Sequence, residues 1–213
     1  MSSSKVMKMP EYRLHYFNGR GAAEPARILF ALADVEYEDV RYEREDWPAK
    51  KPGMPLQALP VLEIDGKMMT QSHAIIRYLA REYGFNGTDN METFRIDEIH
   101  EAIVELQREL YKFHFENDEA KKKEVRQSLV DTIIPKFMNF FERRITENHR
   151  SGGYFVGDGI TLADVLVYNI IFNIEKSQMV SLDNWPKTAA LCKKVASHPK
   201  IADWLKKRPQ TEF

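Results

Sequence analysis

The chain contains a single cysteine, Cys192, among its 213 residues. One cysteine excludes a disulfide within the chain, a cysteine-based zinc cluster and a CxxC redox pair. A reducing, cytoplasmic setting is therefore expected. The six histidines have no paired metal-ligand spacing, so no metal site is expected either.

Long hydrophobic runs and an excess of charge of one sign are also missing. No apolar run approaches the roughly 20 residues that a membrane-spanning helix needs. Residues 1–8 are not apolar enough for a signal peptide and are expected to form a flexible leader. The 31 basic and 32 acidic residues leave a formal net charge of −1. This balance favours neither nucleic acid nor an anionic membrane surface as a partner.

The first 80 or so residues mix strand and helix patterns. Apolar alternation and helix-start signals predict strands at residues 12–17 and 37–40 and helices at 22–33 and 72–83. Residues 61–69 are predicted to form a hairpin, because Asp-Gly between two apolar runs is a favoured two-residue turn. The first part of the chain is therefore expected to be an α/β domain.

After a turn-rich segment the pattern is helical only. Apolar residues recur every three or four positions on two long stretches, and Pro135 is expected to kink or interrupt the second. Residues 161–175 are apolar on nearly every face, which predicts a helix at the centre of its domain. Thr161 and Asp164 have capping-box spacing at its start. The expected organisation is an α/β domain at residues 9–83, a linker at 84–91 and an all-helical domain at 92–213.

Three short segments of the first domain carry groups suited to a peptide-like ligand. Leu59-Pro60 precedes a core strand, and a cis bond there would turn the backbone N–H and C=O of residue 59 outward. Gln71-Ser72 begins a helix, where the serine is either a plain N-cap or receives a carboxylate. Trp47 and Lys51 place an indole N–H and a cation in one loop, as a surface anchor or as a binding site.

These segments in this order resemble the cytosolic glutathione transferases over residues 9–213. The motifs are YFNGRG, EDW, LQALPVLEIDG, QSHAIIRYLAREYGF, GDGITLAD and the ending HPKIADWLKKRPQTEF. They are most similar to the sigma class, which includes invertebrate enzymes, cephalopod lens S-crystallins and haematopoietic prostaglandin D synthases. The resemblance implies a thioredoxin-like N-terminal domain, an all-helical C-terminal domain, a homodimer and glutathione as co-substrate.

The resemblance also implies the catalytic group, which is Tyr16 at the end of the first strand. A thiol with a pKa near ~8.5 is mostly protonated at neutral pH. A hydroxyl that donates a hydrogen bond to the sulfur favours the nucleophilic thiolate. Gly19 and Gly21 would leave room around that sulfur.

The implied glutathione-binding residues surround this tyrosine in the first domain. They are Tyr16, Trp47, Lys51, Gln57, Ala58, Leu59, Gln71 and Ser72. Trp47 and Lys51 would bind the glycine carboxylate, and Ser72 with Gln71 the γ-glutamyl carboxylate. Leu59 would pair through its backbone with the cysteinyl unit. Glu105 of the partner subunit, with Asp97 as a second candidate, would meet the γ-glutamyl ammonium.

An electrophile pocket and a set of structural residues are implied in the same way. The pocket would be lined by Gly21, Ala22, Val104, Gln107, Leu166, Ile170 and Phe213. The structural residues would be Pro60, Thr161 and Asp164. Many sigma enzymes carry an arginine at the position of Ala22, so extra cationic help to the thiolate is in question.

The predicted function is conjugation of glutathione to hydrophobic electrophiles, as in detoxification. Prostaglandin H2 D-isomerisation is the first alternative. It is disfavoured because the first long helix lacks the tryptophan of the prostaglandin synthases. The non-enzymatic alternatives are a structural lens protein and a carrier of haem or other hydrophobic molecules. Negligible turnover would favour the structural protein, and titration with haem tests the carrier.

Overall fold

The structure, a computed structural model, describes residues 10–150 and 152–211. The described residues divide into two compact units, one formed by 10–79 with 208–211 and the other by residues 80–207. The expected leader at residues 1–8 lies outside the described residues. No helix within the described ranges is long and apolar enough to span a membrane.

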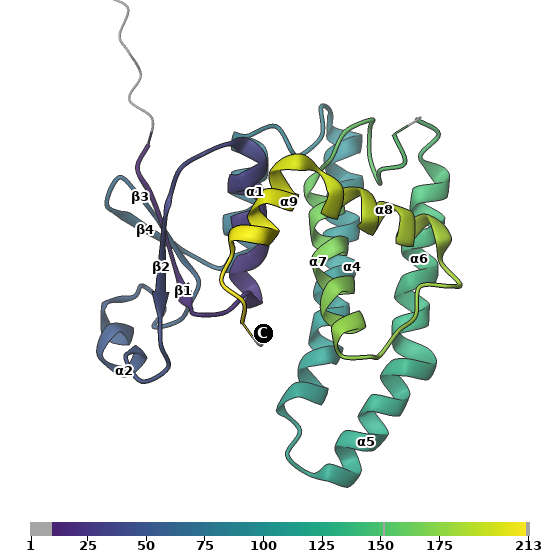
Figure 1. The fold of residues 1–213 in the computed structure, drawn as a ribbon, viewed down its shortest axis with the longest axis horizontal. Coiled ribbons are helices and arrows are strands. Elements are labelled where there is room, and N and C mark those ends of the chain that lie inside the picture. The colour runs from purple at the N-terminus through teal and green to yellow at the C-terminus, as the bar shows by residue number, and fades with distance from the viewer. Residues whose placement is uncertain (1–9, 151, 212–213) are drawn as a thin grey trace, which may run out of the picture. The chain divides into compact units, whose positions relative to one another are not determined.

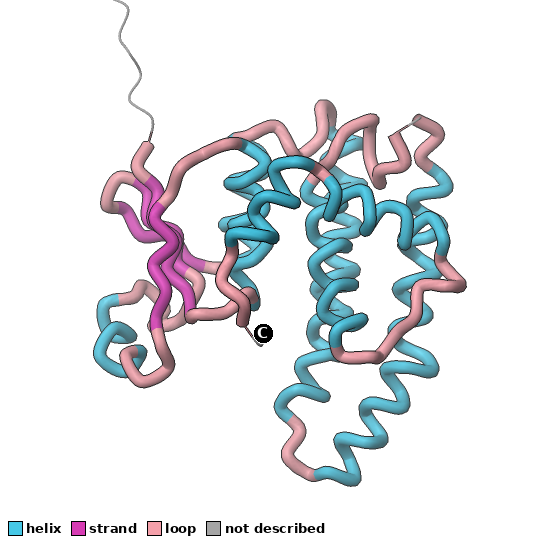
Figure 2. Tube along the Cα trace, in the orientation of Figure 1, coloured by secondary structure: helices cyan, strands magenta, loops and turns pink. Residues whose placement is uncertain are grey.

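The N-terminal unit is built on a four-stranded mixed sheet with the order β2-β1-β3-β4 (Figures 1 and 2). The strands are β1 (Tyr12–Phe17), β2 (Glu38–Tyr42), β3 (Val61–Ile64) and β4 (Lys67–Thr70). The helices are α1 (Glu24–Ala33), α2 (Trp47–Lys50) and α3 (Ser72–Glu82). A 3-10 turn at Gly21–Ala23 precedes α1, and a second at Lys51–Gly53 follows α2. β1 is parallel to β2 and antiparallel to β3.

The core of this unit follows from the alternation of its strands. Leu14 of β1 is paired with Leu62 of β3, and both are fully buried. The predicted hairpin is confirmed. Asp65 (φ 47°) and Gly66 (φ 80°) both adopt left-handed conformations between β3 and β4, as a type I′ turn requires. β2 extends two residues beyond the predicted end at residue 40.

The second unit is all-helical. Its helices are α4 (Asn90–Phe115), α5 (Glu119–Ser128), α6 (Ile134–Glu147), α7 (Leu162–Lys176), α8 (Pro186–Ser197) and α9 (Pro199–Lys207). α7 packs against α4 and α8, and all its residues from Leu162 to Ile171 are buried. The prediction of a central helix is therefore confirmed. α4 begins at residue 90, capped by the Asp89 side chain, so the last two residues of the predicted linker are helical.

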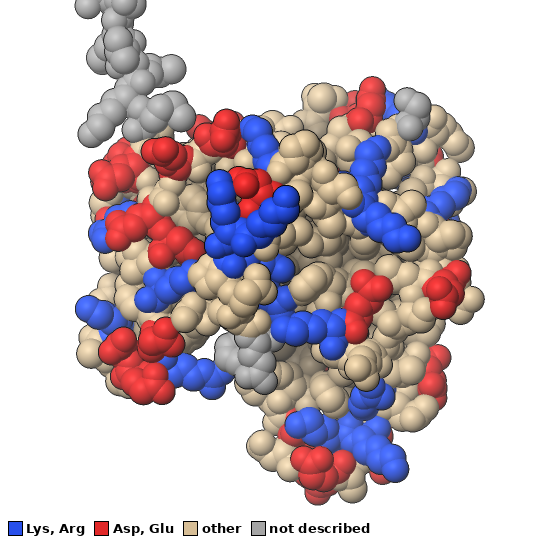
Figure 3. Space-filling view, viewed as in Figure 1, with Lys and Arg blue, Asp and Glu red and all other residues tan. Residues whose placement is uncertain are grey.

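Pro135 interrupts its helix as expected. A five-residue π-helical segment at Leu129–Ile133 joins α5 to α6 just before the proline. Proline has no N–H to bond the carbonyl four residues earlier, so the α-helical hydrogen-bond pattern cannot continue through it. Acidic and basic side chains lie side by side around α5 (Figure 3), as expected for a solvated face.

Asp164 joins the start of α7 to the loop before it. Its carboxylate accepts hydrogen bonds from Thr161 N (2.7 Å), Thr161 Oγ1 (2.7 Å) and Phe155 N (2.9 Å). Asp164 is fully buried, and this burial raises its pKa from 3.8 to about 6 although the hydrogen bonds act in the opposite direction. The capping role predicted for Thr161 and Asp164 agrees with these contacts.

The raised pKa of Asp164 predicts a pH dependence of stability. A folded-state pKa above the unfolded value means that the native state binds the proton more tightly. The resulting stability is fully present below about pH 4 and is lost as pH rises through about 6. We expect the stability of wild type relative to Asp164→Asn to fall by up to about 3 kcal/mol across this range, at about 1.4 kcal/mol per pKa unit.

Urea unfolding of both proteins at several pH values measures this difference. Asp158→Asn is the matched control, because the Asp158 carboxylate is 70% exposed and pairs with Arg150 at the surface. The control should follow wild type from pH 4 to 6. A wild type to Asp164→Asn difference that stays constant or increases with pH would contradict the assigned ionisation.

Candidate functional site

The strand register brings the predicted binding segments to one edge of the sheet. Phe17 at the end of β1 is paired with Tyr42 at the end of the parallel strand β2. Val61 at the start of β3 is opposite His15, and Thr70 at the end of β4 is opposite Val61. The loops after β1, β2 and β4 and the loop before β3 therefore meet at the same edge, where α2 also lies (Figure 1).

Tyr16 lies next to this edge with its hydroxyl proton available. Its Oη accepts a hydrogen bond from the Ala22 N–H at 3.0 Å. No acceptor for the hydroxyl proton lies among the residues that the structure describes. A Cβ atom on Gly21 would lie 2.4 Å from this Oη, and Gly21 has φ +39°. Gly21 therefore makes room for the tyrosine itself, whereas the sequence suggested room for a substrate.

Aromatic contacts fix Trp47 at the start of α2. Its ring packs edge-on against Phe17, with ring centroids 5.5 Å apart. It also packs at a tilt against Tyr42, with ring centroids 6.4 Å apart. Lys51 follows in the next turn and is exposed. Neither the indole N–H nor the Lys51 ammonium bonds to another residue of the described chain. Both groups therefore remain available to a ligand.

Two predicted ligand residues have unusual backbone conformations. Gln57 (φ 49°) and Gln71 (φ 74°) adopt left-handed conformations that cost a residue other than glycine about 1–3 kcal/mol and cluster at functional sites. The Leu59–Pro60 bond is cis, as the sequence suggested. The left-handed backbone of Gln57 and Gln71 at one sheet edge favours a binding site there.

The start of α3 differs from a simple serine cap. The carbonyl of Gln71 accepts the Ile75 N–H at 2.9 Å, so Gln71 occupies the N-cap position. Ser72 is the first helical residue, and its hydroxyl bonds to no residue that the structure describes. Plain N-capping by Ser72 is therefore wrong. The hydroxyl and the first N–H groups of α3 can receive an anion.

A buried arginine below the tyrosine loop was missed by the sequence analysis. Arg27 is fully buried, and its Nη1 donates to the carbonyls of Gly19 (2.6 Å) and Arg20 (3.3 Å). Its Nε bonds Asp39 at 3.1 Å. The three-residue spacing of Glu24 and Arg27 on a helix could have signalled an ion pair. The burial of both groups could not be read from that spacing.

The predicted partner-facing residues lie together on the helical unit. Asp97 and Glu105 line a cavity of about 660 Å³ between α4 and α6. Phe94 on α4, which is 60% exposed, and Phe137 and Phe140 on α6 also line this cavity. The role of Glu105 or Asp97 toward a partner subunit stays a prediction, and both residues line a cavity with apolar and charged side chains.

The predicted electrophile-pocket residues fall in both units. Gly21 and Ala22 belong to the 3-10 turn before α1. Val104 and Gln107 on α4 are half-buried, whereas Leu166 and Ile170 on α7 are buried. Phe213 lies outside the described residues. The electrophile pocket therefore stays a prediction.

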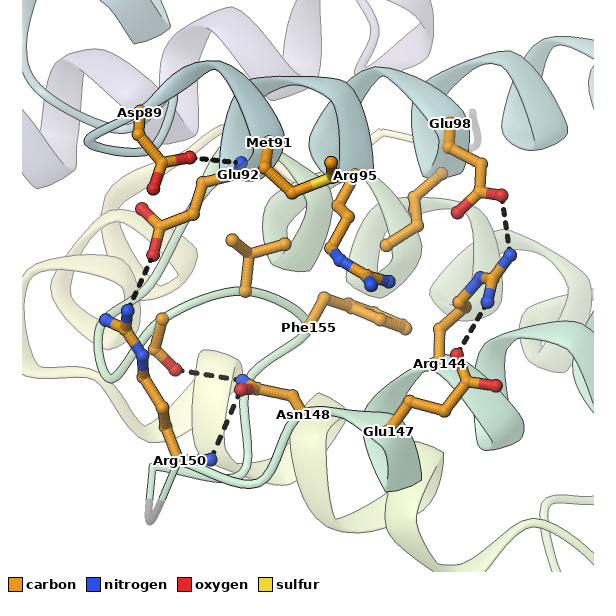
Figure 4. Close-up of a pocket in the computed structure, with 13 residues that line it drawn as sticks. Asp89, Met91, Glu92, Arg95, Glu98, Arg144, Glu147, Asn148, Arg150 and Phe155 are labelled. Atoms are coloured by element: carbon orange, nitrogen blue, oxygen red, sulfur yellow. Dashed lines mark hydrogen bonds and ion pairs between the residues drawn. The ribbon is translucent and has the colours of Figure 1, made fainter.

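A second cavity of about 250 Å³ lies between the start of α4, the end of α6 and residues 155–157 (Figure 4). Two of the arginines that line it, Arg144 and Arg150, are paired with neighbouring acids. Arg144 bonds Glu98 and Glu147 at 2.5 Å each, and Arg150 pairs with Glu92 at 3.2 Å. None of the predicted site residues is among those that line it. The Arg144–Glu98 pair joins α6 to α4, and the Arg150–Glu92 pair joins the loop after α6 to α4.

No group of histidine, cysteine and acidic side chains suited to a metal occurs in the described part of the chain. Cys192 is buried in α8, and this burial raises the pKa of its thiol to about 12. A thiol that stays protonated is a poor nucleophile and a poor metal ligand. The groups at the sheet edge are therefore the strongest candidates for chemistry.

Comparison with known proteins gives a consistent result. Residues 12–81 match the N-terminal domain of glutathione S-transferases and residues 104–208 match the C-terminal domain. S-crystallin SL11 of Nototodarus sloanii is 42% identical over 96% of this chain and 100% of its own length. Probable glutathione S-transferase 7 of Caenorhabditis elegans is 35% identical over the same shares. The structure of prostaglandin synthase D of Nilaparvata lugens has a TM-score of 0.88 at 35% identity, covering 95% of this chain and 100% of that one.

We expect Gly21→Ala to break the hydrogen bond between the Ala22 N–H and Tyr16, because the new methyl group would lie 2.4 Å from the hydroxyl oxygen. The Ala22 amide should lose protection from hydrogen exchange in NMR spectra. Gly66→Ala is the matched control: it shares a positive φ (+80°) but has no atom within 4 Å of its Cβ position. It should lose stability and keep the Ala22 signal. An unchanged Ala22 amide in Gly21→Ala would refute the assigned contact.

Proposed function

The chain belongs to the glutathione S-transferase family, and we propose that Tyr16 activates the thiol of glutathione for transfer to hydrophobic electrophiles. The observation that carries the proposal is the state of the Tyr16 hydroxyl. The Ala22 N–H occupies one lone pair of the oxygen, which leaves the O–H proton to be donated to a sulfur atom. A donor aimed at sulfur lowers the thiol pKa and raises the fraction of thiolate.

The remaining contacts follow from groups that folding leaves unused. The Trp47 indole N–H and the Lys51 ammonium bind the glycine carboxylate of glutathione. The γ-glutamyl carboxylate binds at Ser72 and Gln71, where the first N–H groups of α3 provide a partial positive charge. The backbone of Leu59 pairs with the cysteinyl unit, and Gln57 and Ala58 belong to the same segment. All of these contacts come from the N-terminal unit. Only the γ-glutamyl ammonium needs a residue from elsewhere, in the partner subunit.

The bound thiolate then attacks an electrophilic carbon. The sulfur lone pair forms the new C–S bond, and the leaving group departs with the electrons of the bond that breaks. In an addition, the displaced electrons take up a proton from solvent. Tyr16 acts by lowering the free energy of the thiolate before this step, so its effect appears in the rate at pH values below the thiol pKa.

The proposal includes a homodimer. Asp97, Glu101 and Glu105 on α4 and Lys136 and Arg143 on α6 border the cavity of about 660 Å³. In a two-fold pair the same surface meets itself, so an acidic row on one copy can face the basic residues of the other. The exposed Phe94 adds apolar area to be covered. Glu105 or Asp97 would then reach the γ-glutamyl ammonium in the partner. A reducing, cytoplasmic setting belongs to the same proposal.

The similarity to S-crystallin SL11 and to prostaglandin synthase D supports two alternatives. A structural protein would keep the fold and show negligible turnover. A prostaglandin isomerase would need a specific pocket, and helix α4 has no tryptophan. Steady-state conjugation and prostaglandin isomerisation, measured on one sample with glutathione, separate all three functions.

Tyr16→Phe should lower kcat/KM for conjugation of an aryl halide and leave glutathione affinity nearly unchanged. Loss of a hydrogen bond to a charged group removes about 1–3 kcal/mol, roughly 5- to 150-fold in rate. Steady-state kinetics at pH 6.5 measure the loss. Tyr111→Phe is the control, because Tyr111 is 51% exposed on α4. Equal activity of Tyr16→Phe and wild type would remove Tyr16 from the mechanism.

The homodimer predicts that two defective variants restore each other. Tyr16→Phe and Glu105→Ala should each be weak at subsaturating glutathione. After the subunits are mixed and exchanged, half of the dimers are mixed, and one of their two sites has both native residues. Activity should therefore rise to about one quarter of wild type, as expected for two-fold exchange of subunits. No restoration would show that Glu105 does not act across an interface, and Asp97→Ala provides the same test for the second candidate.

A further inference from the structure

A buried carboxylate on α1 connects the beginning and the end of the chain. Glu24 is 1% exposed, and its Oε1 accepts a hydrogen bond from Arg208 Nη1 at 2.7 Å across 184 residues of sequence. The Arg208 side chain is 10% exposed. Burying a carboxylate is expensive unless cations and donors surround it. The Arg208–Glu24 pair therefore contributes more to the stability of the buried carboxylate than an exposed surface ion pair would.

The second oxygen of Glu24 faces Arg27. Glu24 Oε2 lies 3.5 Å from Arg27 Nη1, a long contact. The same Nη1 donates to the Gly19 carbonyl at 2.6 Å and to the Arg20 carbonyl at 3.3 Å. Arg27 thus binds the loop carbonyls more closely than it binds Glu24. Arg208, at 2.7 Å, lies closer to Glu24 than Arg27 does, and its charge offsets part of the attraction between Glu24 and Arg27.

The two carbonyls lie directly before the residues that contact the tyrosine. Gly21 follows with φ +39°, and Ala22 then donates its N–H to Tyr16 Oη at 3.0 Å. The Arg27 guanidinium carbon is 5.9 Å from the centroid of the Tyr16 ring. The contacts form one continuous series from Arg208 through Glu24 and Arg27 to the loop and the catalytic hydroxyl.

The position of Arg27 in this series depends on the charge of Arg208. The guanidinium groups of Arg27, Arg41 and Arg208 face the carboxylates of Glu24 and Asp39. Without Arg208, less of the Glu24 charge is neutralised, and its attraction for Arg27 in this buried setting increases. Arg27 would then move toward Glu24 and loosen its bonds to the Gly19 and Arg20 carbonyls.

We infer that Arg208 is a positioning residue for Tyr16, acting through Glu24 and Arg27. This inference rests on the proposed function, because it concerns the same thiol. Arg208 holds the charge of Glu24, Arg27 stays on the loop carbonyls, and the Ala22 N–H keeps the Tyr16 hydroxyl oriented toward the sulfur. The segment after α9 is thereby part of the active-site architecture without touching the substrate.

The test is a double-mutant cycle between Arg208→Gln and Tyr16→Phe in the full-length protein. In the Tyr16 background, Arg208→Gln should lower kcat/KM on the order of tenfold, within the range of coupled neighbours. The pH profile should move to higher pH, while the glutathione Kd changes little. In the Tyr16→Phe background the same substitution should have almost no further effect. Arg208→Lys should restore part of the loss because it keeps the charge.

Lys207→Gln is the matched control, since Lys207 forms an exposed pair with Asp203. It should leave activity and pH profile unchanged. An unchanged profile in Arg208→Gln, or an equal loss in both Tyr16 backgrounds, would overturn the inference. If Arg208→Gln does not fold, Arg208→Lys enters the cycle in its place with a smaller expected loss, because its ammonium keeps the charge but lacks the planar guanidinium. That loss should again be absent in the Tyr16→Phe background.

A direct measurement separates this inference from the proposed function. The hydrogen-exchange protection of the Ala22 amide reports the loop contact without any turnover. It should fall in Arg208→Gln and stay unchanged in Lys207→Gln. If Tyr16→Phe is as active as wild type, the catalytic proposal fails, and the Ala22 amide still decides whether Arg208 positions the loop. Full protection in Arg208→Gln would overturn the inference.

Discussion

The candidate site depends on the hydrogen bonds that the buried guanidinium of Arg27 donates to the carbonyls of Gly19 and Arg20. Arg27 is inaccessible to solvent and bonds two consecutive loop carbonyls and Asp39. The loop in turn presents the Ala22 N–H to Tyr16. A buried charge of this kind tolerates few arrangements, because its desolvation is offset only where acceptors and carboxylates lie close to it. The candidate tyrosine is therefore oriented through the loop that Arg27 holds, while its own hydroxyl proton remains available to a ligand.

The sheet supplies the second constraint. One parallel and two antiparallel pairings place the ends of β1, β2 and β4 and the start of β3 at the same edge. Segments separated by more than 50 residues, such as Tyr16 and Ser72, reach one region through this register alone. The site therefore needs no long excursions of the chain. Short loops suffice, and two of their residues, Gln57 and Gln71, adopt left-handed conformations.

Much of this was predictable because local patterns carry it. The strand at 12–17, the Asp65-Gly66 turn, the apolar central helix and the Thr161–Asp164 cap each follow from a few neighbouring residues, and the structure agrees with them. The Arg208–Glu24–Arg27 series was not predictable, since no local pattern links residues 184 positions apart. For Ser72 the sequence left two roles open, a plain cap and a carboxylate-binding residue, and the structure removes the first. A serine at a helix start suggests a cap, but the register of α3 gives that position to Gln71.

The distinction between an enzyme and a structural protein of the same fold lies in the groups that folding does not use. Asp164 and Arg27 make several hydrogen bonds each, and the folded chain gains stability from them whether or not it is an enzyme. The Trp47 N–H, the Lys51 ammonium and the Ser72 hydroxyl bond to no described residue and add little to folding. The left-handed backbone at Gln71 costs free energy. A purely structural role gives no reason to gather unused donors and strain at one edge of a sheet, whereas a peptide with two carboxylates and a thiol does.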